Sequence, residues 1–206
     1  MLIFTAGSFG RAVGRRLADM HDARCADLVE HASSFGNIVR GADFVGVAVS
    51  RPYPALCQAI DVACFEQGIR WSMVQLHGDT LTCGPLVIPG RTACHHCFLS
   101  RAASHYTGAA WERALRAHYA AQPDDGPAGY PAALVEIGAN ALAGDARTQV
   151  ARARVRSVDV LTSSVRESEV VGIHQCPRCR KRPAGYDPTE RSVEHLVPSL
   201  ENLLNG

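Results

Sequence analysis

Two pairs of cysteines are the residues of this chain whose types and spacing are best suited to chemistry. Cys94 and Cys97 enclose two histidines, and Cys176 and Cys179 enclose a proline and an arginine. A two-residue gap lets a tight turn present both sulfurs to one ion, and a tetrahedral zinc site takes four such ligands. Because the pairs lie far apart in the sequence, we predict a structural zinc ion that joins distant segments of one fold, rather than a zinc finger.

Other interpretations of these cysteines remain open. They could be free core thiols or a redox pair, although a thioredoxin-like site needs a single pair at the start of a helix in a βαβ unit. His95 and His96 could also bind the ion, but four thiolates already saturate it, so we expect both to be exposed turn residues. A site closed by four ligands has no open position for water, which argues against hydrolysis by zinc.

Four further cysteines fall in or beside apolar segments, and we expect each to be buried as a small hydrophobic residue: Cys25, Cys57, Cys64 and Cys83. A short basic run beside the second pair comprises Arg178, Arg180, Lys181 and Arg182. Such runs are usually solvated, and docking of an acidic leader peptide is the alternative. The run is short and has no accompanying aromatic residues, so it does not favour nucleic acid.

Length and composition predict one soluble α/β domain. The chain has 206 residues, of which 47% are hydrophobic and 20% charged, and its net charge is +1. That charge gives no general attraction to nucleic acid or an anionic membrane. No apolar run approaches the roughly 20 residues of a membrane span, and no signal peptide is evident. Cysteines without a secretory signal favour reduced thiols and metal ligands, and hence the cytosol.

Short apolar runs alternate with amphipathic stretches, and the chain opens as strand, glycine turn and helix, as in a doubly wound sheet. The predicted strands are Leu2–Ala6, Ala26–Val29, Phe44–Val49, Arg70–Leu76, Thr80–Ile88 (interrupted at Gly84-Pro85), Val155–Leu161 and Ser168–His174, the last two antiparallel around a turn at Thr162–Arg166. The predicted helices are Arg11–Met20, Ala55–Gln67 with Pro54 at its first position, Leu99–Ala121, Pro131–Ala153 and Val193–Leu204, with a polar loop at Gln122–Pro127.

The glycine turn after the first strand carries part of a dinucleotide-binding fingerprint. Its sequence is Gly7-Ser8-Phe9-Gly10, and the full fingerprint would need a glycine where Phe9 stands. Such a turn brings backbone amides and a helix N-terminus against a phosphate. Asp27 lies about 20 residues on, where a ribose hydroxyl could bind. Gly7, Gly10 and Asp27 are therefore candidate cofactor-binding residues, and close packing of strand and helix is the alternative role for the turn.

A more specific pattern follows at Gly84–Cys97, with the sequence GPLVIPGRTACHHC. It closely resembles the segment GPLV-PGRT-C--C of proteins associated with bacteriocin cyclodehydratases, which are relatives of ubiquitin-activating and ThiF-type adenylyltransferases. The order of segments agrees over roughly residues 1–180. The resemblance implies a truncated, Rossmann-like ThiF-type domain, with a Rossmann-like half at 1–93, a zinc-stapled half at 94–180 and a basic C-terminal tail at 181–206.

The resemblance also implies a role in forming thiazole and oxazole rings in ribosomally produced peptides. In that family a YcaO enzyme uses ATP to activate the peptide amide, and the ThiF-like protein supplies a scaffold and usually the leader-docking site. The zinc bound by Cys94, Cys97, Cys176 and Cys179 is then structural. The expected partners are a YcaO-type cyclodehydratase and a precursor peptide, in a homodimer or a hetero-complex.

Two departures from that family shape the expectation. The family's leader-binding winged helix precedes the Rossmann half, where this chain begins, so leader recognition would come from another protein or from a different surface of this chain. Active relatives use an Arg and a Lys around the ATP phosphates and an Asp for magnesium. Here Phe44–Val49 is followed by Ser50-Arg51-Pro52, and Lys181 is the only lysine.

Because the charge of a triphosphate must be neutralised for transfer, we expect a non-catalytic member that does not use ATP. The alternative is an ATP-dependent adenylyltransferase acting on a peptide or small carboxylic acid. A zinc-stabilised interaction module in another pathway is a third hypothesis.

Overall fold

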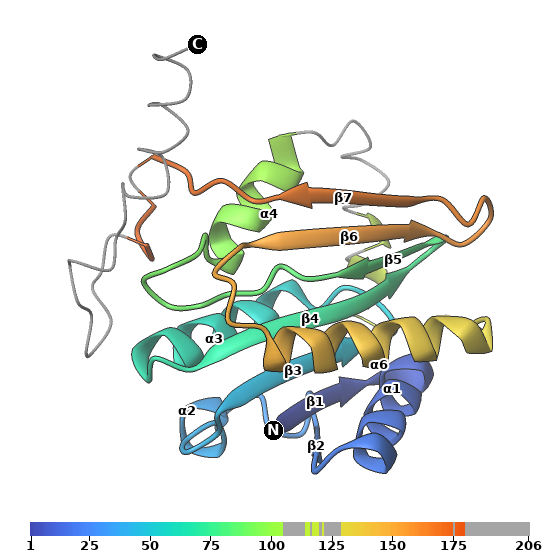
Figure 1. The fold of residues 1–206 in the computed structure, drawn as a ribbon, viewed down its shortest axis with the longest axis horizontal. Helices are drawn as coiled ribbons and strands as arrows, with labels where there is room; N and C mark the ends of the chain where they lie inside the picture. Colours follow the sequence, from blue (N-terminus) through green and yellow to red (C-terminus); the bar gives the residue numbers. More distant parts are fainter. Residues whose placement is uncertain (105–113, 116, 120, 122–128, 175, 180–206) are drawn as a thin grey trace.

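Seven strands form one mixed sheet in the computed structural model, which describes residues 1–104, 114–115, 117–119, 121, 129–174 and 176–179. The strand order is β2-β1-β3-β4-β5-β6-β7 (Figure 1). The parallel strands are β1 (Leu2–Ala6), β2 (Arg24–Asp27), β3 (Phe44–Val49) and β4 (Arg70–His77). The antiparallel strands are β5 (Thr80–Cys83), β6 (Arg154–Asp159) and β7 (Val165–Glu169). The predicted α/β class is therefore confirmed.

Helices cover both faces of the parallel half of the sheet (Figure 1). On one face lie α1 (Gly7–Met20) and α6 (Ala132–Arg147), which share a hydrophobic core with β4 and β5. On the other lie α2 (Phe35–Ile38), α3 (Pro54–Glu66) and α4 (His95–Ser104), whose core includes three of the paired cysteines. All six residues of β3 are buried, which explains why this strand is apolar throughout.

The parallel half follows the sequence prediction closely. β1 and β3 have the predicted bounds, and α3 begins at Pro54, whose fixed φ and missing N–H suit a first helical position. Helix α1 starts at Gly7 instead of Arg11, because Gly7 adopts a positive φ of 73° that turns the chain directly from strand into helix. β2 lies slightly earlier than predicted, and the short α2 was not predicted.

The antiparallel half departs more from the prediction. β5 ends at Cys83 instead of Ile88, because Gly84 has a φ of 98° and turns the chain, after which Val87 forms a bridge with Trp71. α6 ends at Arg147, well before Ala153. β7 covers Val165–Glu169 instead of Ser168–His174, because β6 ends at Asp159 and the turn falls two residues earlier than predicted. α4 begins at His95 instead of Leu99.

Several predicted segments lie outside the described residues, wholly or largely: most of Leu99–Ala121 beyond Ser104, the loop Gln122–Pro127, the helix Val193–Leu204 and the basic residues Arg180, Lys181 and Arg182. Among the helices that the structure describes, none has the length and hydrophobicity needed to cross a membrane.

Candidate metal centre

The four paired cysteines meet at one point in the structure. Their Sγ atoms all lie within 4.8 Å of one another. Cys94 Sγ lies 3.7 Å from Cys97 Sγ and 3.6 Å from Cys176 Sγ, and Cys97 Sγ lies 3.7 Å from Cys179 Sγ. A disulfide needs sulfurs about 2 Å apart, so the four residues are thiols rather than two cystines.

These separations fit a tetrahedral thiolate site. With zinc–sulfur bonds of about 2.3 Å, the sulfurs at the corners of a tetrahedron lie about 3.8 Å apart. Three of the sulfur–sulfur distances fall within a few tenths of an ångström of that value. The donor set is all sulfur, which favours zinc over the hard cations that prefer oxygen. The cluster can therefore hold a metal ion with four protein ligands and no open position.

Two separate segments bring the pairs together. The first pair sits where the chain enters α4, after a turn in which the Thr92 hydroxyl accepts the Ile88 amide at 2.8 Å and donates to the Leu86 carbonyl at 3.2 Å. The second pair follows the chain as it leaves β7. Backbone amides then point at the sulfurs: Ile173 N–H donates to Cys97 Sγ at 3.4 Å, and Cys179 N–H donates to Cys176 Sγ at 3.5 Å. Such contacts orient thiolate ligands and stabilise their charge.

Asp61, a residue that the sequence analysis did not single out, joins both cysteine pairs to the core. It lies in α3 with its side chain fully buried, and Oδ1 accepts from Trp71 Nε1 at 3.2 Å and from the His95 amide at 3.4 Å. Arg178, between the cysteines of the second pair, approaches Oδ2 at 3.9 Å. Burial raises the pKa of Asp61, and Arg178 opposes that shift. The feature of the sequence that could have pointed to Asp61 is a carboxylate among the apolar residues of α3.

His95 is buried, so the expectation that it is an exposed turn residue was wrong. Only 2% of its surface is exposed, and its ring packs 5.2 Å from Trp71 and 5.7 Å from Phe98, centroid to centroid. Burial lowers the pKa of His95 to about 4, which keeps the ring neutral near pH 7. His96 is partly buried rather than exposed. His95 therefore fills the core beneath the first cysteine pair.

The remaining cysteines divide into two groups. Cys57, Cys64 and Cys83 are buried, as predicted. Burial raises the pKa of Cys57 to about 12 and that of Cys83 to about 11, so both thiols stay protonated at neutral pH. Cys25 is exposed, which corrects the prediction that it is buried, because β2 is an edge strand with an open outer side. Its thiol donates to the Gly14 carbonyl at 3.3 Å.

Gly7 and Gly10 lie at the carboxyl end of β1, where a doubly wound sheet would bind a ligand. A side chain at Gly7 would overlap the Ser50 hydroxyl, and one at Gly10 would overlap the Ala48 carbonyl. Ser50 is itself buried, and its Oγ accepts the Phe9 amide at 2.9 Å and the Gly10 amide at 3.4 Å. The Ser50 hydroxyl thus accepts two of the amides at the start of α1, and such amides are the donors that bind a phosphate in a ligand-binding turn.

Asp27 and Arg51 lie, like this turn, at the carboxyl ends of the parallel strands. Asp27 Oδ1 accepts the Val29 amide at 2.8 Å and the Glu30 amide at 3.2 Å, so one carboxylate oxygen closes a turn. Arg51 is only 5% exposed, and its guanidinium lies 4.4 Å from the Tyr53 ring centroid and 4.3 Å from that of Tyr119. From the sequence, Arg51 stands out only as part of a run after β3 that has no carboxylate.

Fold and site together define a doubly wound α/β protein whose sheet is extended by antiparallel strands and joined to a four-thiol cluster. Neither a family model nor a curated protein matches the sequence. Among solved structures, a chain of the E. coli microcin synthetase McbBCD complex has a TM-score of 0.63 at 12% identity, over 85% of this chain and 66% of that one. The heterocyclase TruD has a TM-score of 0.58 at 18% identity, over 86% of this chain.

E. coli MccB, solved with AMPCPP and selenomethionine MccA, has a TM-score of 0.55 at 13% identity, over 86% of this chain and 58% of that one. This chain spans 27% of the length of TruD. At these identities the comparisons establish a shared fold, which chains of heterocyclases and microcin synthetases have in common with this protein.

Proposed function

We propose that this protein is a non-catalytic, ThiF-like partner of a YcaO-type cyclodehydratase, acting in the biosynthesis of a ribosomally produced, azoline-modified peptide. The observation that carries the proposal is the fold shared with TruD and with a chain of the McbBCD synthetase complex. It agrees with the resemblance of Gly84–Cys97 to proteins associated with bacteriocin cyclodehydratases. The protein would hold the cyclodehydratase, and the precursor peptide through a separate leader-binding protein, in one assembly.

The four-thiol site supports a structural role for the metal. Cys94, Cys97 and Cys176 are buried, and four sulfurs complete a tetrahedron, so a bound zinc ion would keep no position for water or substrate. In this proposal zinc contributes folding free energy by joining α4 to the segment that follows β7. It takes no part in peptide chemistry.

The occupied start of α1 supports the proposal that this chain does not use ATP. Ser50 satisfies the amides of Phe9 and Gly10, which would otherwise be donors to a phosphate. The run after β3 supplies no carboxylate for magnesium, and the only lysine is Lys181. Transfer from a triphosphate needs charge neutralisation, so these residues favour a scaffold over an adenylating enzyme.

An ATP-dependent adenylyltransferase acting on a peptide or small carboxylic acid is the second candidate function. The observation that favours it is Arg51, a buried arginine at the carboxyl end of β3 next to the glycine turn. The fold is also shared with MccB, which has been solved with the ATP analogue AMPCPP. If Tyr53 and Tyr119 release Arg51, its guanidinium could meet a phosphate.

One pair of assays separates the two functions. The purified chain is tested alone for ATP–pyrophosphate exchange with peptide and carboxylic acid substrates, and it is then added to a YcaO-type cyclodehydratase while ring formation is followed by mass loss of the peptide. The scaffold predicts no exchange and faster ring formation. Exchange by the chain alone would favour the adenylyltransferase, and ring formation unaffected by the chain would contradict the scaffold.

The matched variants for the second assay are Cys176→Ser and Cys25→Ser. The first removes a ligand of the four-thiol cluster and should abolish the stimulation of ring formation. The second changes an exposed thiol outside the cluster and should leave the stimulation unchanged.

A further inference from the structure

β7 forms one edge of the sheet. It is the last strand in the order, its only strand partner among the described residues is β6, and all five of its residues are exposed. An open edge presents unpaired backbone N–H and C=O groups that can pair with another extended chain. The opposite edge strand, β2, is one residue shorter and runs parallel to β1.

The hydrogen-bonding pattern shows which residues face the open side. Asp159 N–H donates to the Ser164 carbonyl, and Val170 N–H donates to the Ala153 carbonyl. Antiparallel pairs alternate between hydrogen-bonded and non-hydrogen-bonded, so the even-numbered residues from 164 to 170 bond to β6. The backbone groups of Val165, Glu167 and Glu169 therefore point outward. The open edge ends beyond them, where the Val171 carbonyl accepts from Arg101 at 3.4 Å.

Charges on one face of this hairpin alternate from strand to strand. Arg156 and Arg154 on β6 lie opposite Glu167 and Glu169 on β7, so the four side chains share a face. Arg156 also lies 4.0 Å from Asp145 of α6, next to the sheet. Arg154 approaches Glu167 at 3.5 Å, but both side chains are about half exposed, so this pair leaves the carboxylate accessible. A further strand beside β7 would continue the alternation if its facing side chains were basic.

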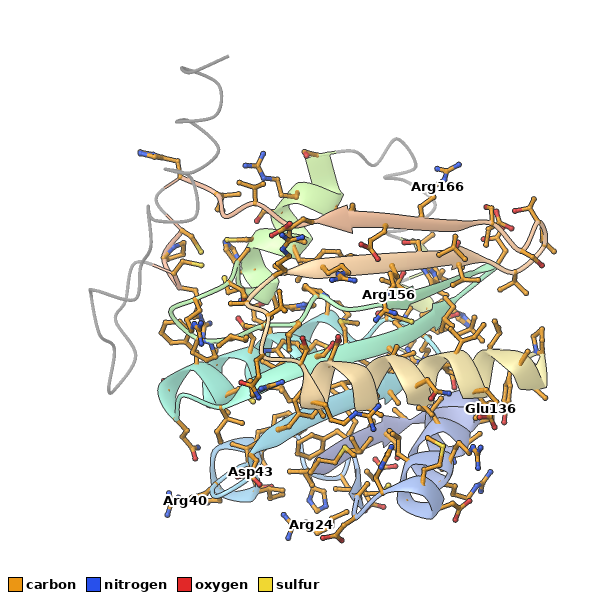
Figure 2. All side chains as sticks on the ribbon, in the orientation of Figure 1. Arg24, Arg40, Asp43, Glu136, Arg156 and Arg166 are labelled. Carbon is orange, nitrogen blue, oxygen red and sulfur yellow. The ribbon has the colours of Figure 1, made fainter. Side chains whose placement is uncertain are left out.

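The same charges disfavour a second copy of this chain as the added strand. A two-fold axis would pair β7 antiparallel with itself. The three central registers would then place Glu167 against Glu167, Arg166 against Arg166, or Glu167 against Glu169, in each case like charges directly opposite. Figure 2 shows Arg166 extending from this edge strand.

Apolar side chains lie at both ends of the edge. Val165 is 63% exposed, Leu161 80% and Val171 68%, and they account for half of the large hydrophobic side chains found exposed among the described residues. An edge that only had to avoid pairing would gain nothing from exposed apolar groups at its ends.

We propose that the outer edge of β7 binds an extended segment of another polypeptide by strand addition, and that this segment carries basic side chains at two alternate positions, opposite Glu167 and Glu169, and an apolar one opposite Val165. Backbone groups of Val165, Glu167 and Glu169 supply the hydrogen bonds, and the carboxylates supply the sequence preference. The inference is independent of the proposed function and concerns a surface away from the glycine turn.

Hydrogen exchange tests the proposal at the residues that define it. The full, metal-loaded chain is labelled with 15N and mixed with a synthetic peptide that carries lysine at two alternate positions, to face Glu167 and Glu169, and valine at the next alternate position, to face Val165. In the free chain the amides of Arg166, Ser168 and Val170 should be protected, and those of Val165, Glu167 and Glu169 should exchange freely. Saturating peptide should slow exchange of the second set at least tenfold. Unchanged exchange of that set would overturn the proposal.

Two peptide controls and one pair of variants sharpen the result. A peptide with N-methyl groups at the residues whose amides face β7 should give no protection, and equal protection by it would exclude strand addition. The double variant Glu167→Lys/Glu169→Lys should bind the lysine peptide about tenfold more weakly. It should bind a peptide with glutamate in place of lysine more tightly. Glu136→Lys, on α6 away from β7 (Figure 2), makes the same charge change and should leave the affinity unaltered.

Hydrogen exchange in the chain without peptide tests two other possible occupants of the β7 edge. If the three outward amides are already protected and become exposed on dilution, a second copy pairs there and the proposal is wrong. If they are protected at every concentration, the chain covers its own edge, and the proposal is equally wrong.

Discussion

Two regions of the molecule, the glycine turn after β1 and the four-thiol cluster, both bring residues into close contact, but with different results. At the parallel end, the turn after β1 has the glycines of a ligand-binding loop, but Gly7 and Gly10 make room for Ser50 and for the backbone of β3. In the core beneath α3 and α4, four sulfurs lie within 4.8 Å of one another, as the ligands of one tetrahedral ion do. The glycines are packed closely against Ser50 and the backbone of β3, whereas the four sulfurs are close enough together to bind one metal ion.

The difference shows why spacing is more informative for cysteines than for glycines. A glycine can be required because the chain needs a positive φ or a close backbone approach, whether or not a ligand binds. Four thiols, three of them buried and one partly buried, gain little by contrast from meeting at one point unless an ion joins them. Substitutions in either region test this difference, and those in the four-thiol cluster should have the largest effect.

Loss of one cluster cysteine should have the largest effect. Cys176→Ser leaves three thiolates, so the variant should lose bound zinc and most of the folding free energy that metal binding supplies. Exchange should rise in α4 and in the segment after β7, while β1 and β3 stay protected. Elemental analysis and hydrogen exchange measure both effects. Cys25→Ser, an exposed thiol, is the control, and a Cys176→Ser variant that keeps zinc would refute the four-thiol assignment.

Removal of the buried carboxylate comes next in size. Asp61→Ala leaves Arg178 without its partner and Trp71 Nε1 without an acceptor, which should lower the free energy of unfolding by about 3 kcal/mol. Zinc should also dissociate faster, since Arg178 lies between two ligands. Denaturant unfolding and transfer of zinc to a chelator measure these quantities. Asp79→Ala, at an exposed turn, should change stability by less than about 0.5 kcal/mol.

In the glycine turn after β1, Gly10→Ala should lower the free energy of unfolding by about 1–3 kcal/mol. The added methyl group would overlap the Ala48 carbonyl, and the backbone of β3 cannot easily move. Gly144→Ala in α6 is the matched control. Its methyl group would meet nothing within 4 Å, so the change should raise stability by up to about 1 kcal/mol. Thermal unfolding compares the two. Equal effects would show that α1 is not packed closely against β3.

The features that the sequence predicts correctly depend on residues that are neighbours in the chain, or on a strict chemical requirement. The bounds of β1 and β3 follow from continuous apolar runs, and the thiol cluster follows from two matched spacings. The buried state of His95 could not be predicted, because it depends on Trp71 and Phe98 being beside it in space. Asp61 was missed for the same reason: its partners come from β4 and from both cysteine pairs.

The smallest effect should come from Ser50→Ala, and it decides what the start of α1 can bind. Without the hydroxyl, the amides of Phe9 and Gly10 lose their acceptor, which should cost about 1 kcal/mol. Inorganic phosphate should then restore part of the stability of the variant by accepting from the same amides, and it should leave the unsubstituted chain unchanged. Ser104→Ala, at an exposed hydroxyl on α4, controls for the loss of a serine. Phosphate that stabilises the unsubstituted chain equally would mean that anions bind beside Ser50, and the adenylyltransferase would become the better proposal.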